Sequence, residues 1–171
     1  MAELFEKFGE FDSAEEINRA AAAQKAEGDY EAVYDIAEEN GIDREDAQAY
    51  IDGEEEELCN VLMAAYGKLK VEAEHYEFKG IMEDWVNELR QECADSEELA
   101  RNVRRKGRSL AGYTVRLIED SFANRIEVNK EIQKKCSSAV KSFMGAHPLT
   151  IGSTNLAGRR RIMKTYYGGN K

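Results

Sequence analysis

Apolar residues recur at helical spacing along almost the whole chain, and signals that end helices divide this pattern into short pieces. The clearest stripe joins Ile81, Trp85 and Leu89, which lie four residues apart and so share one side of a helix. Only one proline, Pro148, is present to interrupt helices. The pattern predicts an all-α fold, a compact multi-helix bundle of short and medium helices with Trp85 as a core anchor.

Capping residues and glycines set the expected limits of each helix. Ser13, Asp29, Asp43 and Asn155 stand where a side-chain oxygen accepts hydrogen bonds from the first free N–H groups of a helix. Glycines such as Gly28 then end the helices. The expected helices cover residues 14–26, 29–39, 43–52, 54–75, 81–93, 97–106, 109–124, 127–144 and 156–167, and 145–154 is the one sustained loop.

Residues 29–53 have the outline of a helix-turn-helix, with Asn40 and Gly41 in the turn. The exposed side of the second helix, residues 43–52, is acidic and would repel the phosphates of DNA. This charge favours a packed helical hairpin, or a surface that faces a protein, over a DNA-reading motif.

The charge on the chain is split between its two ends. Residues 1–100 hold 30 Asp or Glu and 8 Lys or Arg, whereas residues 101–171 hold 4 and 16. The net charges are −22 and +12, so the whole-chain charge of −10 conceals a basic C-terminal third. We expect an acidic helical region at 1–98 and a basic helical region at 99–171, within one continuous domain. The asymmetry indicates nucleic acid, or proteins that handle it, as partners.

Two clusters of basic residues stand out in the C-terminal third. The candidate nucleic-acid-binding residues are Arg101, Arg104, Arg105, Arg108, Arg159, Arg160, Arg161 and Lys164. Arginine donates bidentate hydrogen bonds to phosphate, and Tyr166 and Tyr167 beside the second cluster have rings suited to stacking on exposed bases. Between the clusters, the basic surface is extended by Lys130, Lys134, Lys135 and Lys141. The alternative is that these side chains pair with the acidic half of the same molecule, and both interpretations stay open.

The sequence gives little support for catalysis, metal binding or a membrane span. The cysteines Cys59, Cys93 and Cys136 are odd in number and far apart, which fits a reducing cytoplasm without disulfides. Glu72-x-x-His75 has the spacing of a di-iron helix, but the second copy that such a site needs is missing, so we expect no metal and no cofactor. We find no P-loop, nucleophile elbow, signal peptide or bilayer-length apolar run. We therefore expect a cytoplasmic protein that is not an enzyme.

Six segments together carry a resemblance to a known family. They are AEEINRAAAAQ (14–24), IAEENGID (36–43), LMAAYGKL (62–69), GIMEDW (80–85), VRRKGRSL (103–110) and YYGG (166–169). The chain resembles small proteins found on mobile elements of gut Firmicutes, a family of type II-A anti-CRISPR proteins that inhibit Cas9. The segments extend over most of the chain, and the family brings no catalytic motif with it.

This resemblance implies a protein of the bacterial host cytoplasm that binds Cas9, or Cas9 with its guide RNA, and blocks target DNA binding or cleavage by occlusion. Cas9 holds nucleic acid in positively charged channels, where an acidic helical surface would compete as a DNA mimic. The candidate partner-binding residues on that surface are Glu38, Glu39, Asp43, Glu45, Asp46, Asp52, Glu54 and Glu55. The basic third would instead hold DNA or RNA.

Two other kinds of function stay open. One is a nucleic-acid-binding accessory protein of a conjugative or phage-like mobile element, with the basic third as its main site. The other is an interaction module whose two halves neutralise each other. The apolar faces of the short helices fit an intramolecular core and a homo-oligomer interface equally well.

Overall fold

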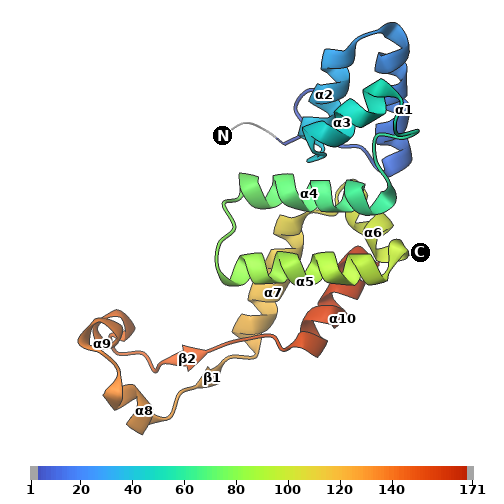
Figure 1. Cartoon of the computed structure of the whole chain (residues 1–171). Helices are drawn as coiled ribbons and strands as arrows, with labels where there is room; N and C mark the ends of the chain where they lie inside the picture. Colours follow the sequence, from blue (N-terminus) through green and yellow to red (C-terminus); the bar gives the residue numbers. More distant parts are fainter. Residues whose placement is uncertain (1–3, 169–171) are drawn as a thin grey trace.

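The structure, a computed structural model that describes residues 4–168, is almost entirely helical and confirms the all-α prediction (Figure 1). In this part of the chain there are ten helices and one antiparallel two-stranded ribbon. They are α1 (Ala14–Glu27), α2 (Tyr30–Glu39), α3 (Arg44–Asp52), α4 (Val61–His75), α5 (Ile81–Asp95), α6 (Glu97–Arg104), α7 (Leu110–Ala123), β1 (Ile126–Glu127), α8 (Lys130–Lys135), α9 (Ser138–Met144), β2 (Thr150–Ile151) and α10 (Leu156–Tyr167). Residues 1–3 of the predicted acidic region and residues 169–171 of the predicted basic region lie outside the described residues.

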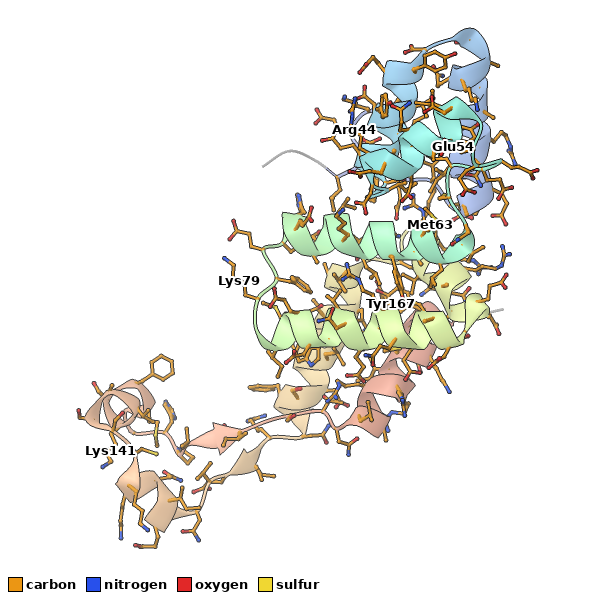
Figure 2. The ribbon with its side chains drawn as sticks, viewed as in Figure 1. Arg44, Glu54, Met63, Lys79, Lys141 and Tyr167 are labelled. Atoms are coloured by element: carbon orange, nitrogen blue, oxygen red, sulfur yellow. The ribbon has the colours of Figure 1, made fainter. Side chains whose placement is uncertain are left out.

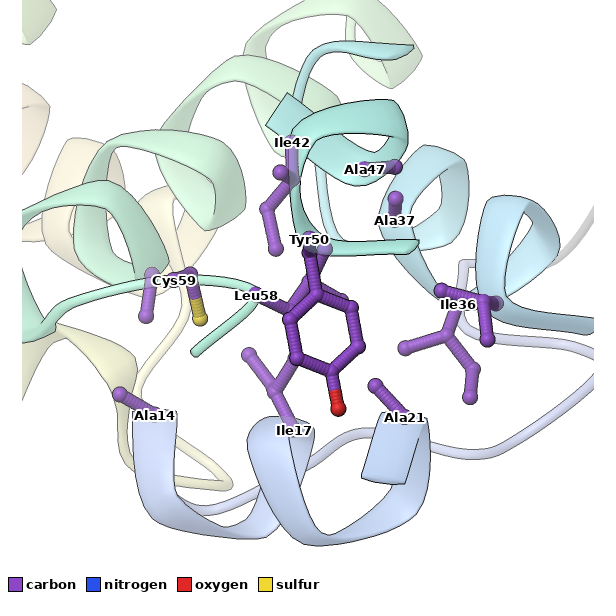
Figure 3. Close-up of a cluster of buried hydrophobic side chains, with 12 residues drawn as sticks. Ala14, Ile17, Ala21, Ile36, Ala37, Ile42, Ala47, Tyr50, Leu58 and Cys59 are labelled. Atoms are coloured by element: carbon purple, nitrogen blue, oxygen red, sulfur yellow. The ribbon is translucent and has the colours of Figure 1, made fainter. Parts of the chain in front are cut away.

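The first three helices form an N-terminal unit with a core of its own. The predicted caps begin two of them, since Ser13 Oγ accepts from the Glu16 N–H and Asp29 Oδ1 accepts from the Ala32 N–H. The side chains of these helices close around the ring of Tyr50 (Figure 3). The buried cluster consists of Ala14, Ile17, Ala21, Val33, Ile36, Ala37, Ile42, Ala47, Tyr50, Leu58, Cys59 and Ala64.

A second core joins α4, α5, α6, α7 and α10. Its buried residues are Ala65, Leu69, Val86, Leu89, Cys93, Ala100, Val103, Leu110, Tyr113, Leu117, Met163 and Tyr167. Trp85 packs against this core from a half-buried position. Acidic α5 and basic α10 line the same core, so the reversal of charge near residue 98 is not a packing boundary. The division between the cores instead runs along α4, which places Ala64 in the first and Ala65 in the second.

The N-terminal unit meets α4 through a contact between two glycines. Gly41, in the turn between α2 and α3, has a φ of +68°, which favours glycine. A Cβ atom built on it would lie 2.7 Å from the Cα of Gly67, in the middle of α4. A Cβ on Gly67 would in turn overlap the carbonyl oxygen of Asn40. Only a hydrogen at both positions lets the turn and the helix approach this closely.

The helix predicted for 54–75 begins seven residues late, at Val61. Gly53 ends α3 in the left-handed conformation, and residues 54–60 then run as an irregular segment. Four adjacent glutamates repel one another in a helical first turn, whereas here they remain exposed while Leu58 enters the first core. Asn60 starts α4, because its Oδ1 accepts from the Met63 N–H at 2.9 Å.

The single helix predicted for 127–144 does not form. Residues 124–153, which we call the arm, protrude from the body of the protein instead. The arm consists of β1, α8, α9 and β2, and Figure 1 shows it projecting from the end of α7 at the lower left. The predicted loop contains β2, which pairs with β1 in the register Ile126 to Ile151. Asn129 and Ser137 each cap a new short helix, and so they break the expected long one.

Candidate functional site

The predicted acidic residues form an exposed surface on the N-terminal unit. Seven of the eight are exposed, and Glu39 is half-buried because it accepts hydrogen bonds from the N–H groups of Lys7 and Phe8 at 2.7 and 3.0 Å. Asp43 forms an exposed ion pair with Lys70 at 2.8 Å. Residues 29–57 contain 13 Asp or Glu and a single basic residue, Arg44, so most of these carboxylates have no cation near them in the chain.

The irregular segment 54–60 gathers some of these carboxylates around one hollow. Asp46 from α3 and Glu54, Glu55, Glu56 and Glu57 line it, together with Leu58, Cys59, Asn60 and Met63. Figure 2 shows Glu54 and Met63 at this end of the molecule. The candidate residues chosen from the sequence omit Glu56 and Glu57, although the run of four glutamates was the signal that would have included them.

The first basic cluster is largely occupied by contacts within the chain. Arg101 forms ion pairs with Glu15 at 2.7 Å and with Glu97 at 2.8 Å. Arg104 is 1% exposed. Arg108 is half-buried and donates to the carbonyl oxygen of Tyr166, while Arg105 is exposed. Of these four candidates, Arg105 is the one whose guanidinium is both exposed and outside an ion pair in the described residues.

The second basic cluster lies on α10 and also faces carboxylates. Arg159 pairs with Glu88 at 2.8 Å and Arg160 with Glu92 at 2.6 Å, both across the gap between α10 and α5. Arg161 lies 3.6 Å from Asp120 on α7. Lys164 is exposed and has no ion pair among residues 4–168. The structure therefore supports internal pairing for most of this cluster.

The two tyrosines predicted to stack on bases are instead packed inside the protein. Tyr167 is buried, and Tyr166 is half-buried with its hydroxyl accepting from the Ser109 N–H at 3.0 Å. Their rings lie against each other and against Tyr113. Neither ring is presented to a nucleic acid in this arrangement, because the end of α10 closes the second core.

Three charged side chains, those of Lys68, Glu72 and Arg104, are buried where the N-terminal segment meets α4 and α6, and the half-buried Glu10 joins them. The ammonium group of Lys68, fully buried, donates to Glu10 and to the carbonyl oxygen of Arg105. Glu72 lies 3.9 Å from Lys68 and accepts from the Leu110 N–H at 2.5 Å. Arg104 donates to the Asn40 side-chain oxygen at 2.7 Å, while its Nε and Nη1 have no partner in the described residues. The cluster links both cores through charges that balance.

The buried cluster makes stability depend on pH. Burial raises the pKa of Glu72 to about 7, although Lys68, the Leu110 N–H and Arg104 act in the opposite direction and Glu10 adds to the rise. Because the folded protein holds this proton more tightly than an unfolded carboxyl of pKa 4.5, the stabilisation is complete below pH 4.5 and is lost as the pH rises through 7. We expect this group to lower the free energy of unfolding by about 3 kcal/mol between these limits.

Glu72→Gln isolates this effect from the many other carboxylates. Glutamine keeps an oxygen for the Leu110 N–H but does not titrate, so the variant should lose less stability than the parent between pH 5 and pH 8. Urea unfolding at both pH values gives the two differences. Equal pH dependence in parent and variant would contradict the raised pKa of Glu72.

Metal-binding and thiol chemistry find no support in the described residues. Within residues 4–168 no three His, Cys, Asp or Glu side chains converge to hold a metal ion. Glu72 of the Glu72-x-x-His75 motif is engaged in the buried cluster. Burial raises the pKa of the Cys59 and Cys93 thiols to about 12, so both are protonated and unreactive at neutral pH. None of the described helices is both long and apolar enough to cross a membrane.

The fold and its surfaces define an all-α protein with an acidic helical unit at one end and a protruding arm at the other. Comparison of the chain with models of known families, with curated proteins and with solved structures finds no match. The interpretation of its function therefore depends on the geometry and charge of these surfaces.

Proposed function

We propose that this protein is a stoichiometric inhibitor of a Cas9-type RNA-guided nuclease, and that it acts by placing its acidic surface in the nuclease's nucleic-acid channel. The acidic surface comprises the exposed carboxylates of Glu38, Asp43, Glu45, Asp46, Asp52, Glu54, Glu55, Glu56 and Glu57. The resemblance in sequence suggests the class of target, and the charge of this surface suggests how the two proteins recognise each other.

The observation that carries the proposal is the contrast between the predicted basic clusters and the carboxylates around the hollow lined by Glu54. In the basic third, Arg101, Arg159 and Arg160 form ion pairs with glutamates of residues 1–100. The carboxylates around the hollow of Glu54 form no ion pair in the described residues. Between the two predicted basic clusters and the carboxylates around this hollow, the carboxylates thus keep more of their charge available for a partner, which fits a basic protein channel better than DNA.

A helical acidic surface is suited to a channel that binds nucleic acid through its backbone. Such a channel recognises closely spaced negative charges on a rigid support, and its lysines and arginines do not distinguish phosphate from carboxylate by sequence. α3 and the segment 54–57 offer carboxylates of this kind on a folded unit. Binding there excludes guide or target strands by occupancy, so inhibition needs about one inhibitor for each nuclease and no turnover.

Removal of the charge around the hollow should abolish most of the inhibition. The variant Glu54→Gln, Glu55→Gln, Glu56→Gln, Glu57→Gln changes the net charge by four while keeping the side chains' size. The matched control changes four exposed carboxylates elsewhere, Glu74→Gln, Glu77→Gln, Glu83→Gln and Asp84→Asn. In a target-cleavage assay we expect the half-inhibitory concentration to rise about tenfold or more for the first variant and less than about twofold for the control.

Addition of the protein before or after guide loading, and before or after target DNA, identifies the blocked step. Equal loss in both variants would mean that total charge matters and the hollow does not. A failure of the parent protein to inhibit any of several Cas9 proteins at equimolar dose would rule out the proposed function. Salt-sensitive binding to DNA in that case would favour the accessory nucleic-acid-binding protein instead.

A further inference from the structure

Exposed apolar side chains are concentrated at the end of the molecule opposite the acidic surface. Val115, Ile118 and Phe122 on α7 are 50%, 53% and 64% exposed, and their spacing of three and four residues places them on one face. We call these three residues the α7 strip. The arm continues the apolar surface, since Ile126 and Ile151 are cross-strand partners that share one exposed face of the ribbon. Phe143 in α9 is 95% exposed.

The arm lacks an interior of its own. Neither α8 nor α9 contains a buried residue, and no arm residue belongs to either core. Two helices of six and seven residues and a ribbon of two residue pairs are too short to be stable alone in water. A continuous set of exposed apolar side chains on α7 and the arm indicates a binding partner.

The polar neighbours of the α7 strip indicate which partner fits. Arg116 and Glu119 border the strip on the same side, one turn apart, and both are exposed. Neither forms an ion pair within the part of the chain that the structure describes. When two copies of such a strip face each other and are related by a rotation of 180°, the positive side chain of each copy lies opposite the negative side chain of the other. The strip is therefore complementary to a second copy of itself.

We propose that a second copy of this chain packs on the α7 strip, so that two α7 helices lie antiparallel about a two-fold axis. Such an axis keeps the charged side of one strip against the charged side of the other. Ile118 then meets its own symmetry mate, and Val115 of each copy lies near Phe122 of the other. Arg116 of each copy pairs with Glu119 of the other, which gives two equivalent interchain ion pairs.

This arrangement accounts for the arm and does not depend on the proposed function. Each arm extends from the end of its α7 and therefore runs alongside the body of the other copy, where its apolar side chains are shielded from water. The acidic surfaces stay exposed because they lie at the far end from the arm, as Glu54 and Lys141 show in Figure 2. The dimer would thus present two acidic surfaces rather than cover them.

A charge-swap experiment tests the second copy specifically. Arg116→Glu creates a chain with two glutamates beside the strip, and Glu119→Arg creates one with two arginines. Each variant alone places like charges opposite each other, so we expect its dimer dissociation constant to rise about tenfold or more. An equimolar mixture restores opposite charges at both pairs and should form a heterodimer. Sedimentation velocity of the parent, each variant and the mixture, over a range of concentrations, measures these equilibria.

Apolar substitutions provide a matched control. Ile118→Glu, in the strip, should give a monomer, whereas Ile81→Glu, at the equally exposed start of α5, should leave the dimer unchanged. Far-ultraviolet circular dichroism of each variant verifies that it is folded. A monomeric parent, single charge variants that dimerise as the parent does, or a mixture that stays monomeric would each overturn the proposal. Inhibition of a nuclease is read in a separate assay, so failure of either proposal leaves the other standing.

Discussion

Gly67→Ala is expected to lower the free energy of unfolding by about 3–5 kcal/mol. In an ordinary helix interior the same change raises stability by about 1 kcal/mol, because alanine is the better helix former. Here the new methyl group would overlap the Asn40 carbonyl oxygen and lie 3.1 Å from its carbon, and both atoms belong to the backbone. Because neither atom is the end of a flexible side chain that could move aside, the N-terminal unit must shift away from α4.

Urea unfolding of the purified variant measures this loss. Gly28→Ala is the control for the clash, because nothing lies within 4 Å of the added Cβ, although Gly28, unlike the helical Gly67, has a φ of +78°. It should cost only about 1 kcal/mol, the price of the left-handed backbone. A Gly67→Ala protein as stable as the parent would show that the α2–α3 turn and α4 do not approach as closely as the structure has them.

Lys68→Met is expected to lower the free energy of unfolding by about 3–5 kcal/mol at pH 8. The ammonium group is buried and neutralises Glu10 and Glu72, so its removal leaves the buried carboxylate of Glu72 and the half-buried one of Glu10 without this cation. Methionine fills a similar volume, and the loss is therefore electrostatic rather than a cavity. The loss should shrink at pH 5, where Glu72 is protonated.

Two comparisons separate the buried charge from other effects of the substitution. Lys70→Met, two residues along the same helix, breaks an exposed ion pair with Asp43 and should cost less than about 1 kcal/mol. Lys68→Met combined with Glu72→Gln removes one negative charge as well and should recover part of the stability. If Lys68→Met and Lys70→Met cost the same in urea unfolding, the buried cluster contributes no more than a surface pair.

Local signals predicted most helices well. Ser13, Asp29 and Asn155 each cap a helix through a side-chain oxygen as predicted, whereas Asp43 precedes α3 without a capping hydrogen bond, and α10 spans the predicted 156–167. Each cap depends on residues within three or four positions of the helix start, so it can be predicted from the sequence without knowledge of the tertiary fold. The acidic surface was predictable for the same reason, because a run of carboxylates with one arginine nearby has too few cations to be buried.

Features that depend on distant parts of the chain were not predictable. Residues 54–60 have helical composition, yet Leu58 and Cys59 leave the helix to fill the first core. The arm has an amphipathic pattern suited to one helix, but no core is available to hold it. Arg104 lies at helical spacing from Arg101 and Arg108, which predicted an exposed basic cluster. It is buried instead, because α6 crosses α4 beside Asn40.

The helical class, the segregation of charge and most helix ends can be read from the amino-acid sequence, since all three follow from composition and short-range capping. Which charges remain available to a partner depends on how the helices pack in three dimensions. This packing brought Arg159 and Arg160 against Glu88 and Glu92, which are about seventy residues away, and left the carboxylates of 54–57 unpaired. The physical reason is that a charge is neutralised by the groups that the fold brings within a few ångströms of it, and sequence spacing does not specify those groups.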